Sequence, residues 1–166
     1  MNDVPGVDMS TGSLGQGLSA ANGMAISAKM DNKNYRVYCI LGDGEIEEGQ
    51  VWEAAMSSNK YKLDNLCVIV DNNNLQIDGT IEEVMDLKSI DEKFKSFGFN
   101  VIKIDGHDFT QIKDSLKQAK ETKGMPTCII AKTIKGKGVS FMENQAGWHG
   151  KAPNEEQYNQ AMSDLT

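Results

Sequence analysis

The sequence has 166 residues, enough for one domain with a hydrophobic core and too few for two ordinary ones. Its formal net charge is -7, and its lysines and arginines are spread along the chain. Nucleic acids and anionic membranes attract basic surfaces, so the composition excludes both as main partners. The longest apolar runs are far too short to cross a bilayer, and residues 1–6 lack the pattern of a signal peptide. We therefore expect a single module over residues 1–166, located in the cytoplasm.

Hydrophobic periodicity and turn residues predict alternating helices and strands. In chain order, we expect a loop over 2–9, a turn over 10–13, a helix over 14–30, a strand over 35–41, a helix over 51–58, a strand over 66–70, a polar loop through 79, a helix over 89–97, a strand over 100–104, a helix over 110–121, a strand over 127–131, a loop over 135–153 and a helix over 155–162. This alternation predicts an α/β fold with a mostly parallel β-sheet flanked by helices. The strands are nearly continuous apolar runs, which suits burial on both faces.

Three cysteines, Cys39, Cys67 and Cys128, each lie inside a β-branched or apolar run. None of them forms a Cys-x-x-Cys pair, so a zinc or redox role is disfavoured. We expect three buried thiols that pack as small hydrophobic groups.

Two of the predicted strands end in unusual polar segments. Gly42-Asp43-Gly44-Glu45 follows the strand 35–41, and Asp71-Asn72-Asn73-Asn74-Leu75 follows the strand 66–70. Asp43 and Asn73 are 30 residues apart, about one βαβ unit, which brings both segments to the same edge of the sheet. A carboxylate, an amide oxygen and a backbone carbonyl there would suit Mg²⁺, which prefers oxygen ligands and often binds phosphates as well.

Other interpretations of these segments are weaker. Each segment alone is also typical of a simple turn, because Gly, Asp and Asn tolerate positive φ. An EF-hand over residues 71–82 fails, since Leu75 and Gln76 stand where an oxygen ligand and a glycine are needed. A dinucleotide loop at 12–17 has the order G-x-x-G-x-G and follows no strand.

The complete set of motifs resembles the transketolase family of thiamin diphosphate enzymes. The resemblance is carried by Gly42-Asp43-Gly44 with Asn73, by Thr11-Gly12-Ser13-Leu14-Gly15-Gln16-Gly17, by Lys132-Thr133-Ile134-Lys135-Gly136-Lys137-Gly138, and by Trp148-His149-Gly150-Lys151. It runs over essentially the whole chain and implies the thiamin diphosphate-binding fold. In particular, the chain resembles the N-terminal, cofactor-binding subunit of a split, two-chain transketolase. Relative to that family we expect the chain to be truncated at its N-terminus and to lack the helix-rich segment that normally comes first.

The resemblance also implies a set of site residues. The expected metal ligands are Asp43, Asn73 and the backbone carbonyl of Leu75, holding Mg²⁺ with Ca²⁺ or Mn²⁺ as substitutes. The residues expected at thiamin diphosphate are Gly12, Leu14, Gly42, Gly44, Glu45, Ile77, Lys135 and His149. His149 is also the expected catalytic residue, although an ordinary surface histidine fits the same sequence. His107 is expected to be structural, since Asp108 is well placed to cap the next helix.

The implied activity is transfer of a two-carbon ketol unit from a ketose phosphate to an aldose phosphate, as in the pentose phosphate pathway. The family's activating carboxylate comes from a pyrimidine-binding domain, so the implied partner is a C-terminal, pyrimidine-domain subunit. Two alternatives stay open: a different thiamin diphosphate enzyme, such as a deoxyxylulose-phosphate-type synthase, or a non-catalytic cofactor-binding or interaction module.

Overall fold

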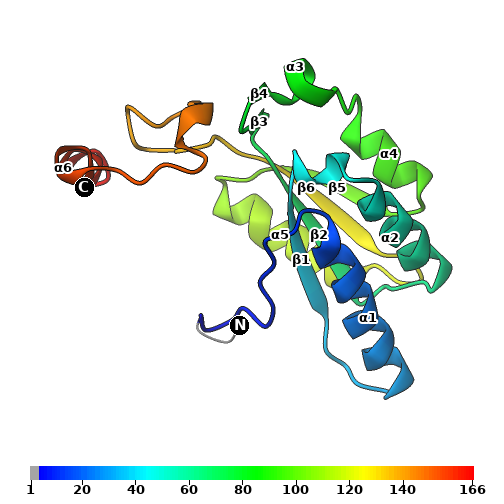
Figure 1. Cartoon of the computed structure of the whole chain (residues 1–166). Coiled ribbons are helices and arrows are strands. Elements are labelled where there is room, and N and C mark those ends of the chain that lie inside the picture. The colour runs from blue at the N-terminus through cyan, green and yellow to red at the C-terminus, as the bar shows by residue number, and fades with distance from the viewer. Residues whose placement is uncertain (1–3) are drawn as a thin grey trace.

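Four parallel strands form the central sheet in the order β1-β2-β6-β5, as the computed structural model shows for the described residues 4–166 (Figure 1). The elements are α1 (Gln16–Met30), β1 (Val37–Gly42), η1 (Glu45–Glu47), α2 (Gly49–Lys60), β2 (Leu66–Asn72), β3 (Leu75–Gln76), β4 (Gly79–Thr80), α3 (Ile81–Met85), α4 (Ile90–Ser96), β5 (Asn100–Asp105), α5 (Phe109–Glu121), β6 (Thr127–Lys132), η2 (Ala146–Trp148) and α6 (Glu155–Asp164). The predicted parallel sheet with flanking helices is confirmed. Because all four strands run the same way, their carboxyl ends share one edge of the sheet.

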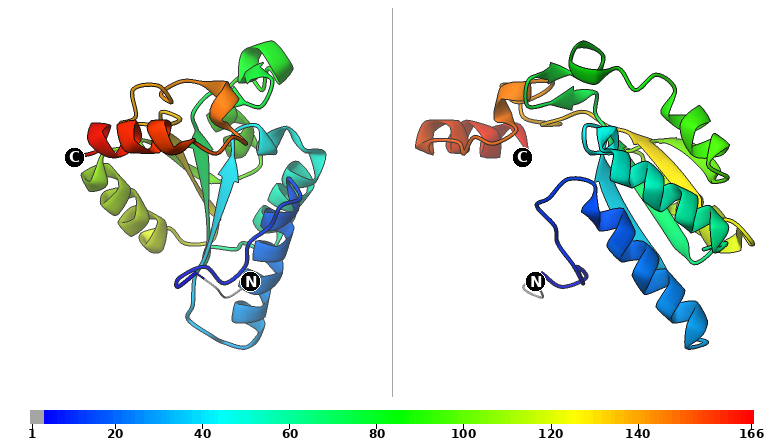
Figure 2. Two further views of the ribbon diagram at one scale, coloured as in Figure 1. Left: turned by 60° about the vertical axis from the view of Figure 1, so that its left-hand side comes forward. Right: turned by 45° about the vertical axis from the view of Figure 1, so that its right-hand side comes forward.

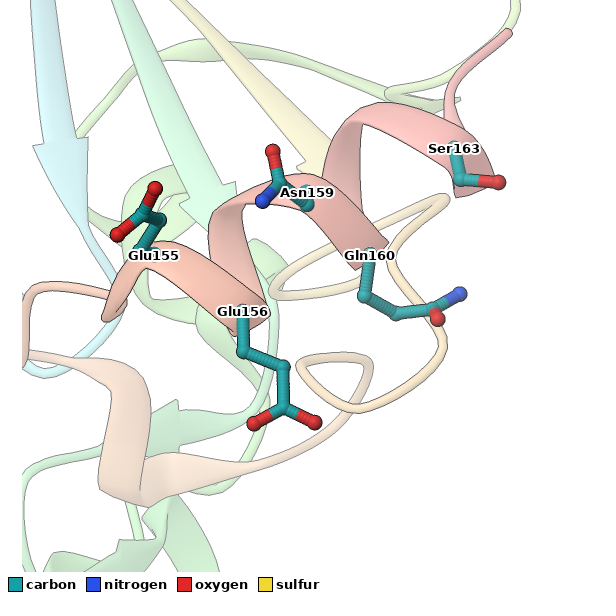
Figure 3. Close-up of a pocket in the computed structure, with 5 residues that line it drawn as sticks. All are labelled: Glu155, Glu156, Asn159, Gln160 and Ser163. Carbon is teal, nitrogen blue, oxygen red and sulfur yellow. The ribbon is translucent and has the colours of Figure 1, made fainter.

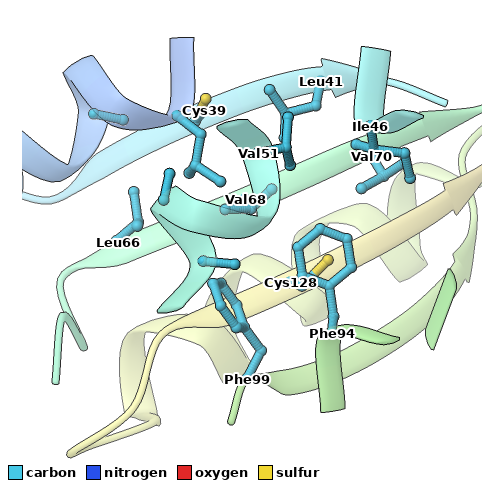
Figure 4. Close-up of a cluster of buried hydrophobic side chains, with 14 of the residues drawn as sticks. Cys39, Leu41, Ile46, Val51, Leu66, Val68, Val70, Phe94, Phe99 and Cys128 are labelled. Atoms are coloured by element: carbon cyan, nitrogen blue, oxygen red, sulfur yellow. The ribbon is translucent and has the colours of Figure 1, made fainter. Parts of the chain in front are cut away.

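The helices cover the two faces of the sheet unequally. Figure 2 shows α1, α2 and α4 on one face and α5 on the other. The larger core lies under α1, α2 and α4. There, Val68 of β2 and Cys128 of β6 pack close to Phe94 of α4 (Figure 4). A smaller cluster, centred on Cys67 and Ile129, packs beneath α5. The middle strands β2 and β6 therefore contribute side chains to both clusters.

Burial on both faces holds for the two middle strands but is wrong for β1. Alternate side chains of β1 are buried, while Tyr38 and Ile40 are exposed, Ile40 to 72%. The reason is topological, because β1 is an edge strand and no helix covers that part of its outer face. An apolar run predicts a strand, but it does not predict the strand's place in the sheet.

The segment after β2 also differs from the predicted polar loop. It folds into a short antiparallel hairpin, in which Leu75 pairs with Thr80 and Gln76 with Gly79. The hairpin leads into α3, whose first turn is closed by a capping box between Thr80 and Glu83. Two-residue strands carry too little periodicity to be recognised in a sequence.

The three cysteines are buried and unpaired, as predicted. Burial raises the pKa of Cys39 and of Cys67 to about 11, and the nearby Glu45 carboxylate adds to the effect at Cys39. Over the described range, residues 4–166, no helix is long and apolar enough to span a bilayer.

Candidate cofactor and metal site

Hydrogen bonds between the strands continue past their carboxyl ends. The Asp43 N–H donates to the carbonyl oxygen of Asp71 at 3.2 Å, which joins the exits of β1 and β2. The Thr133 N–H donates to the carbonyl oxygen of Asn72 at 3.1 Å, and the Thr133 hydroxyl donates to the Asp71 carboxylate, which joins β2 to β6. The exit of β5 is joined to β6 by the Gly106 N–H, 2.8 Å from the Lys132 carbonyl oxygen. All four strand exits are thus fixed relative to one another.

Asp43 is the most buried charged group at this edge, with 2% of the residue exposed. Its Oδ2 accepts the Asn74 N–H at 2.5 Å, and its Oδ1 accepts the Gly44 N–H at 3.0 Å. Burial raises the pKa of the Asp43 carboxyl, against the lowering effect of those two hydrogen bonds, and the nearby Asp71 carboxylate raises it further. A carboxylate that burial disfavours and that retains free lone pairs is well suited to a cation.

Asn73 and Leu75 flank Asn74, whose N–H is bonded to the Asp43 carboxylate. The Asn73 Oδ1 accepts the Leu75 N–H at 3.0 Å, so the two residues form a tight turn after β2. The hairpin packs against the segment after β1: a Cβ on Gly44 would lie 3.2 Å from the Gln76 Cβ, and Gln76 Nε2 donates to Glu47 at 2.8 Å. The structure therefore brings the three predicted metal ligands together on adjoining loops.

Glu45 links two of the predicted cofactor segments. Its Oε1 accepts the Gly15 N–H at 2.9 Å, and its Oε2 accepts the Gly42 N–H at 3.1 Å. Gln50 adds a second link, because its Nε2 donates to the Leu14 carbonyl oxygen at 2.8 Å. One carboxylate thereby holds residues 12–17 against the end of β1. Gln50 was not recognised in the sequence, since nothing local marks a side chain that reaches a loop 36 residues away.

The remaining predicted site residues are more exposed. Gly12 is exposed, Leu14 is 57% exposed and Ile77 is 68% exposed, so two large apolar side chains face solvent. Lys135 is half-buried, and its carbonyl oxygen accepts the Asn144 N–H at 3.0 Å. His149 has an exposed side chain and follows η2, with its N–H bonded to the Ala146 carbonyl oxygen. Within residues 4–166, no hydrogen bond joins either of these basic side chains to Asp43.

Two hollows have linings that do not include Asp43, Asn73 or Leu75. One, of about 650 Å³, is formed by a single polar face of α6, with Glu155, Glu156, Asn159, Gln160 and Ser163 around it (Figure 3). The other, of about 920 Å³, runs between α1, β1 and the chain before α1, and reaches Glu45 at one end. The described part of the chain holds no group of three His, Cys, Asp or Glu side chains that could bind a metal. A metal here would depend on amide and carbonyl oxygens beside Asp43.

Comparison with known proteins assigns the chain to a family. The family described as transketolase, thiamine diphosphate binding domain, matches residues 1–165. The chain belongs to the transketolase thiamine diphosphate-binding family. The resemblance predicted from the motifs is therefore confirmed, and thiamine diphosphate is the cofactor for which this family's domain is named.

Curated relatives match almost all of the chain. It is 46% identical over 164 residues to one subunit of the apulose-4-phosphate transketolase of Phocaeicola vulgatus, covering 99% of this chain and 58% of that protein. It is 44% identical over 165 residues to a 6-deoxy-6-sulfo-D-fructose transketolase subunit of Clostridium sp., covering 99% of this chain and 60% of that protein. Both relatives are named as subunits, in agreement with the predicted resemblance to one subunit of a split transketolase. The chain spans about three fifths of the length of these relatives.

Solved structures show the same fold. The transketolase of Campylobacter jejuni superposes with a TM-score of 0.89 at 36% identity, covering 95% of this chain and 26% of that one. Among the curated relatives, which are compared by sequence, human transketolase is 48% identical over 147 residues, which cover 87% of this chain and 23% of the human protein. These likenesses confirm the thiamine diphosphate-binding α/β fold predicted for the chain.

The donor set beside Asp43 fits a magnesium–diphosphate group. The Asp43 carboxylate accepts two backbone N–H groups, which leaves about half of its lone-pair positions free for a cation. The Asn73 amide oxygen and the Leu75 carbonyl are neutral hard donors, as Mg²⁺ prefers. A single carboxylate leaves the cation with net positive charge, which a diphosphate would neutralise.

Proposed function

We propose that the chain is the cofactor-binding subunit of a two-chain transketolase that transfers a ketol unit from a ketose phosphate to an aldose phosphate. The observation that carries the proposal is the arrangement of Asp43, Asn73 and Leu75 on adjoining loops at the carboxyl edge, in a chain of this family. Thiamin diphosphate with Mg²⁺ would supply the carbon nucleophile and the electron sink that ketol transfer needs, and the residues of this chain would hold it.

The residues of this chain would bind, orient and shield that group. Asp43, Asn73 and Leu75 would hold the metal by their oxygens, and Lys135 would add a positive charge near the diphosphate. Leu14 and Ile77 would bury their exposed apolar side chains against the cofactor rings, which removes water from the site. Glu45 would keep residues 12–17 in place beside Gly42.

His149 would lie at the cofactor and act on the substrate. Its side chain is exposed, and Gly147 and Gly150 lie close to it in the sequence. An imidazole N–H there would donate to the oxygen on which negative charge develops as the ketose carbonyl is attacked. This role needs the loop to close over the bound cofactor.

The partner is a pyrimidine-domain subunit that would complete the site. The support is the naming of the curated relatives as subunits. The motif resemblance also implies that the activating carboxylate comes from a second domain. The test is ketol transfer measured by the chain alone, by the candidate partner alone and by the two mixed. We expect turnover only in the mixture; appreciable turnover by the chain alone would refute the need for a partner.

The same mixture separates the two alternatives. If the mixture is also given a 2-oxo acid, and product analysis shows its two-carbon unit joined to a triose phosphate with its carboxyl group released as carbon dioxide, the chain belongs to a synthase. If the mixture binds thiamin diphosphate and Mg²⁺ by calorimetry but turns over no ketose phosphate, the chain is a cofactor-binding module.

A further inference from the structure

His107 makes a specific contact that its position in the sequence does not predict. Its ring atom Nε2 accepts the backbone N–H of Ile134 at 2.8 Å, across 27 residues. Accepting at Nε2 requires the proton to sit on Nδ1, so this contact selects one neutral tautomer. The residue was expected to be structural because Asp108 caps the next helix, and Asp108 does so by accepting the Thr110 and Gln111 N–H groups. The side-chain contact of His107 is additional to that cap.

The backbone at His107 is fixed on both sides. The His107 N–H donates to Asp105 Oδ1 at 2.9 Å, and Asp108 begins α5 directly afterwards. Gly106 allows the exit of β5 to press against the exit of β6, since a Cβ there would lie 2.5 Å from the Thr133 Cγ2. The imidazole therefore projects from a rigid turn, not from a loose surface loop.

The contact acts on the residue immediately before Lys135. Thr133 is held from the β2 side by the Asp71 carboxylate and the Asn72 carbonyl, whereas Ile134 is held from the β5 side by His107. Together these bonds fix the direction in which the chain leaves β6. Lys135 comes next, and its carbonyl oxygen is bonded to the Asn144 N–H.

We propose that His107 is a positioning residue for the diphosphate end of the cofactor site: by accepting the Ile134 N–H, it places Lys135 over the carboxyl edge of the sheet. This inference rests on the proposed function, in which Lys135 meets the diphosphate. Fixing the backbone of Lys135 before binding raises the affinity for the diphosphate, because less conformational entropy is lost when the cofactor binds. His107 itself does not contact the cofactor.

The test compares His107→Ala with His107→Gln in the full chain. Glutamine places its Oε1 near the position of the imidazole Nε2, so it can still accept the Ile134 N–H, whereas alanine cannot. The first measurement is the hydrogen-exchange rate of the Ile134 amide by NMR, without any ligand. The second is the affinity for thiamin diphosphate with Mg²⁺, measured by calorimetry in the presence of the partner subunit. Because the side chain is exposed, both variants should fold, which circular dichroism checks.

We expect His107→Ala to speed exchange of the Ile134 amide and to weaken cofactor affinity, each by roughly two- to tenfold, the range of one net hydrogen bond. His107→Gln should restore both toward wild type. His149→Ala, which alters the only other histidine of the sequence, is the control for exchange and should leave the Ile134 amide unchanged.

Three results would overturn the inference. Unchanged exchange in His107→Ala would show that the contact does not hold Ile134. Faster exchange with unchanged cofactor affinity would show that the hydrogen bond from Ile134 to His107 has no role at the site. Equal defects in the alanine and glutamine variants would show that loss of the hydrogen-bond acceptor is not their cause. Failure of the wild type to bind thiamin diphosphate in the presence of the partner subunit would overturn the proposed function as well. The exchange measurement reports the contact between His107 and Ile134 independently of any ligand.

Discussion

Replacing Asp43 separates its role in the fold from its role at the metal. The carboxylate is buried and accepts two backbone N–H groups, from Gly44 and Asn74. Asp43→Ala removes both acceptors and the negative charge. Asp43→Asn keeps the shape and one acceptor but places an amide NH₂ against the other N–H, and it also removes the charge. The two variants should therefore differ in stability and agree in metal binding.

The expected loss of stability follows from the two hydrogen bonds. A buried N–H left without an acceptor costs about 1–3 kcal/mol. Removal of a carboxylate whose pKa is raised by burial offsets part of this cost. We expect a net loss of about 2 kcal/mol for Asp43→Ala and about 1 kcal/mol for Asp43→Asn. For a chain of this size, those losses correspond to falls in Tm of roughly 4–8 °C and 2–4 °C.

Metal-dependent binding should fail in both variants. Changes to the outer partners of metal ligands already cost roughly 10- to 100-fold in affinity, so loss of the only charged ligand should cost at least as much. Calorimetric titration of thiamin diphosphate, with Mg²⁺ and with a chelator, measures the effect, and scanning calorimetry gives Tm. Asp114→Ala, on the exposed face of α5, is the control and should change neither. Wild-type affinity of Asp43→Asn in Mg²⁺ would refute the assignment of Asp43 as a metal ligand.

Three further predictions concern the remaining groups. His149→Ala, assayed with saturating cofactor in the presence of the partner, should lower turnover by about 10²–10³-fold with little change in cofactor affinity. Turnover within about threefold of wild type would show that His149 is an ordinary surface histidine. Glu45→Gln should lower Tm by about 2–4 °C, since the Gly15 or Gly42 N–H loses its acceptor, and scanning calorimetry showing no change would contradict the link between these loops. Cys39 and Cys67, with pKa values of about 11, should react slowly with a thiol reagent at pH 8 in the native protein and rapidly in denaturant. Equally fast labelling of the native and the denatured protein would contradict the predicted slow reaction. Because the folded pKa values are raised, the stability that the neutral thiols contribute is complete below pH 9.0 and is lost as the pH rises toward about 11.

The sequence alone determined the class of fold and the chemistry of its carboxyl edge. The strands at β1, β2, β5 and β6 were predicted within two residues at each end, because apolar runs bounded by turn residues form a strong local signal. The spacing between Asp43 and Asn73 was sufficient to place both beyond neighbouring parallel strands, since βαβ geometry leaves few other possibilities. The cofactor roles of individual residues came from the family's motifs and remain to be tested.

Only the tertiary structure decided which side chains meet across the loops. Glu45 joins residues 12–17 to Gly42, and His107 holds Ile134 from 27 residues away. Such contacts leave no periodic trace, because a side-chain hydrogen bond depends on where two distant turns come to lie. The exposure of Ile40 was decided in the same way, by the position of β1 at the sheet edge. Local hydrophobic pattern specifies elements and their order, whereas the packing of those elements fixes burial and long-range partners.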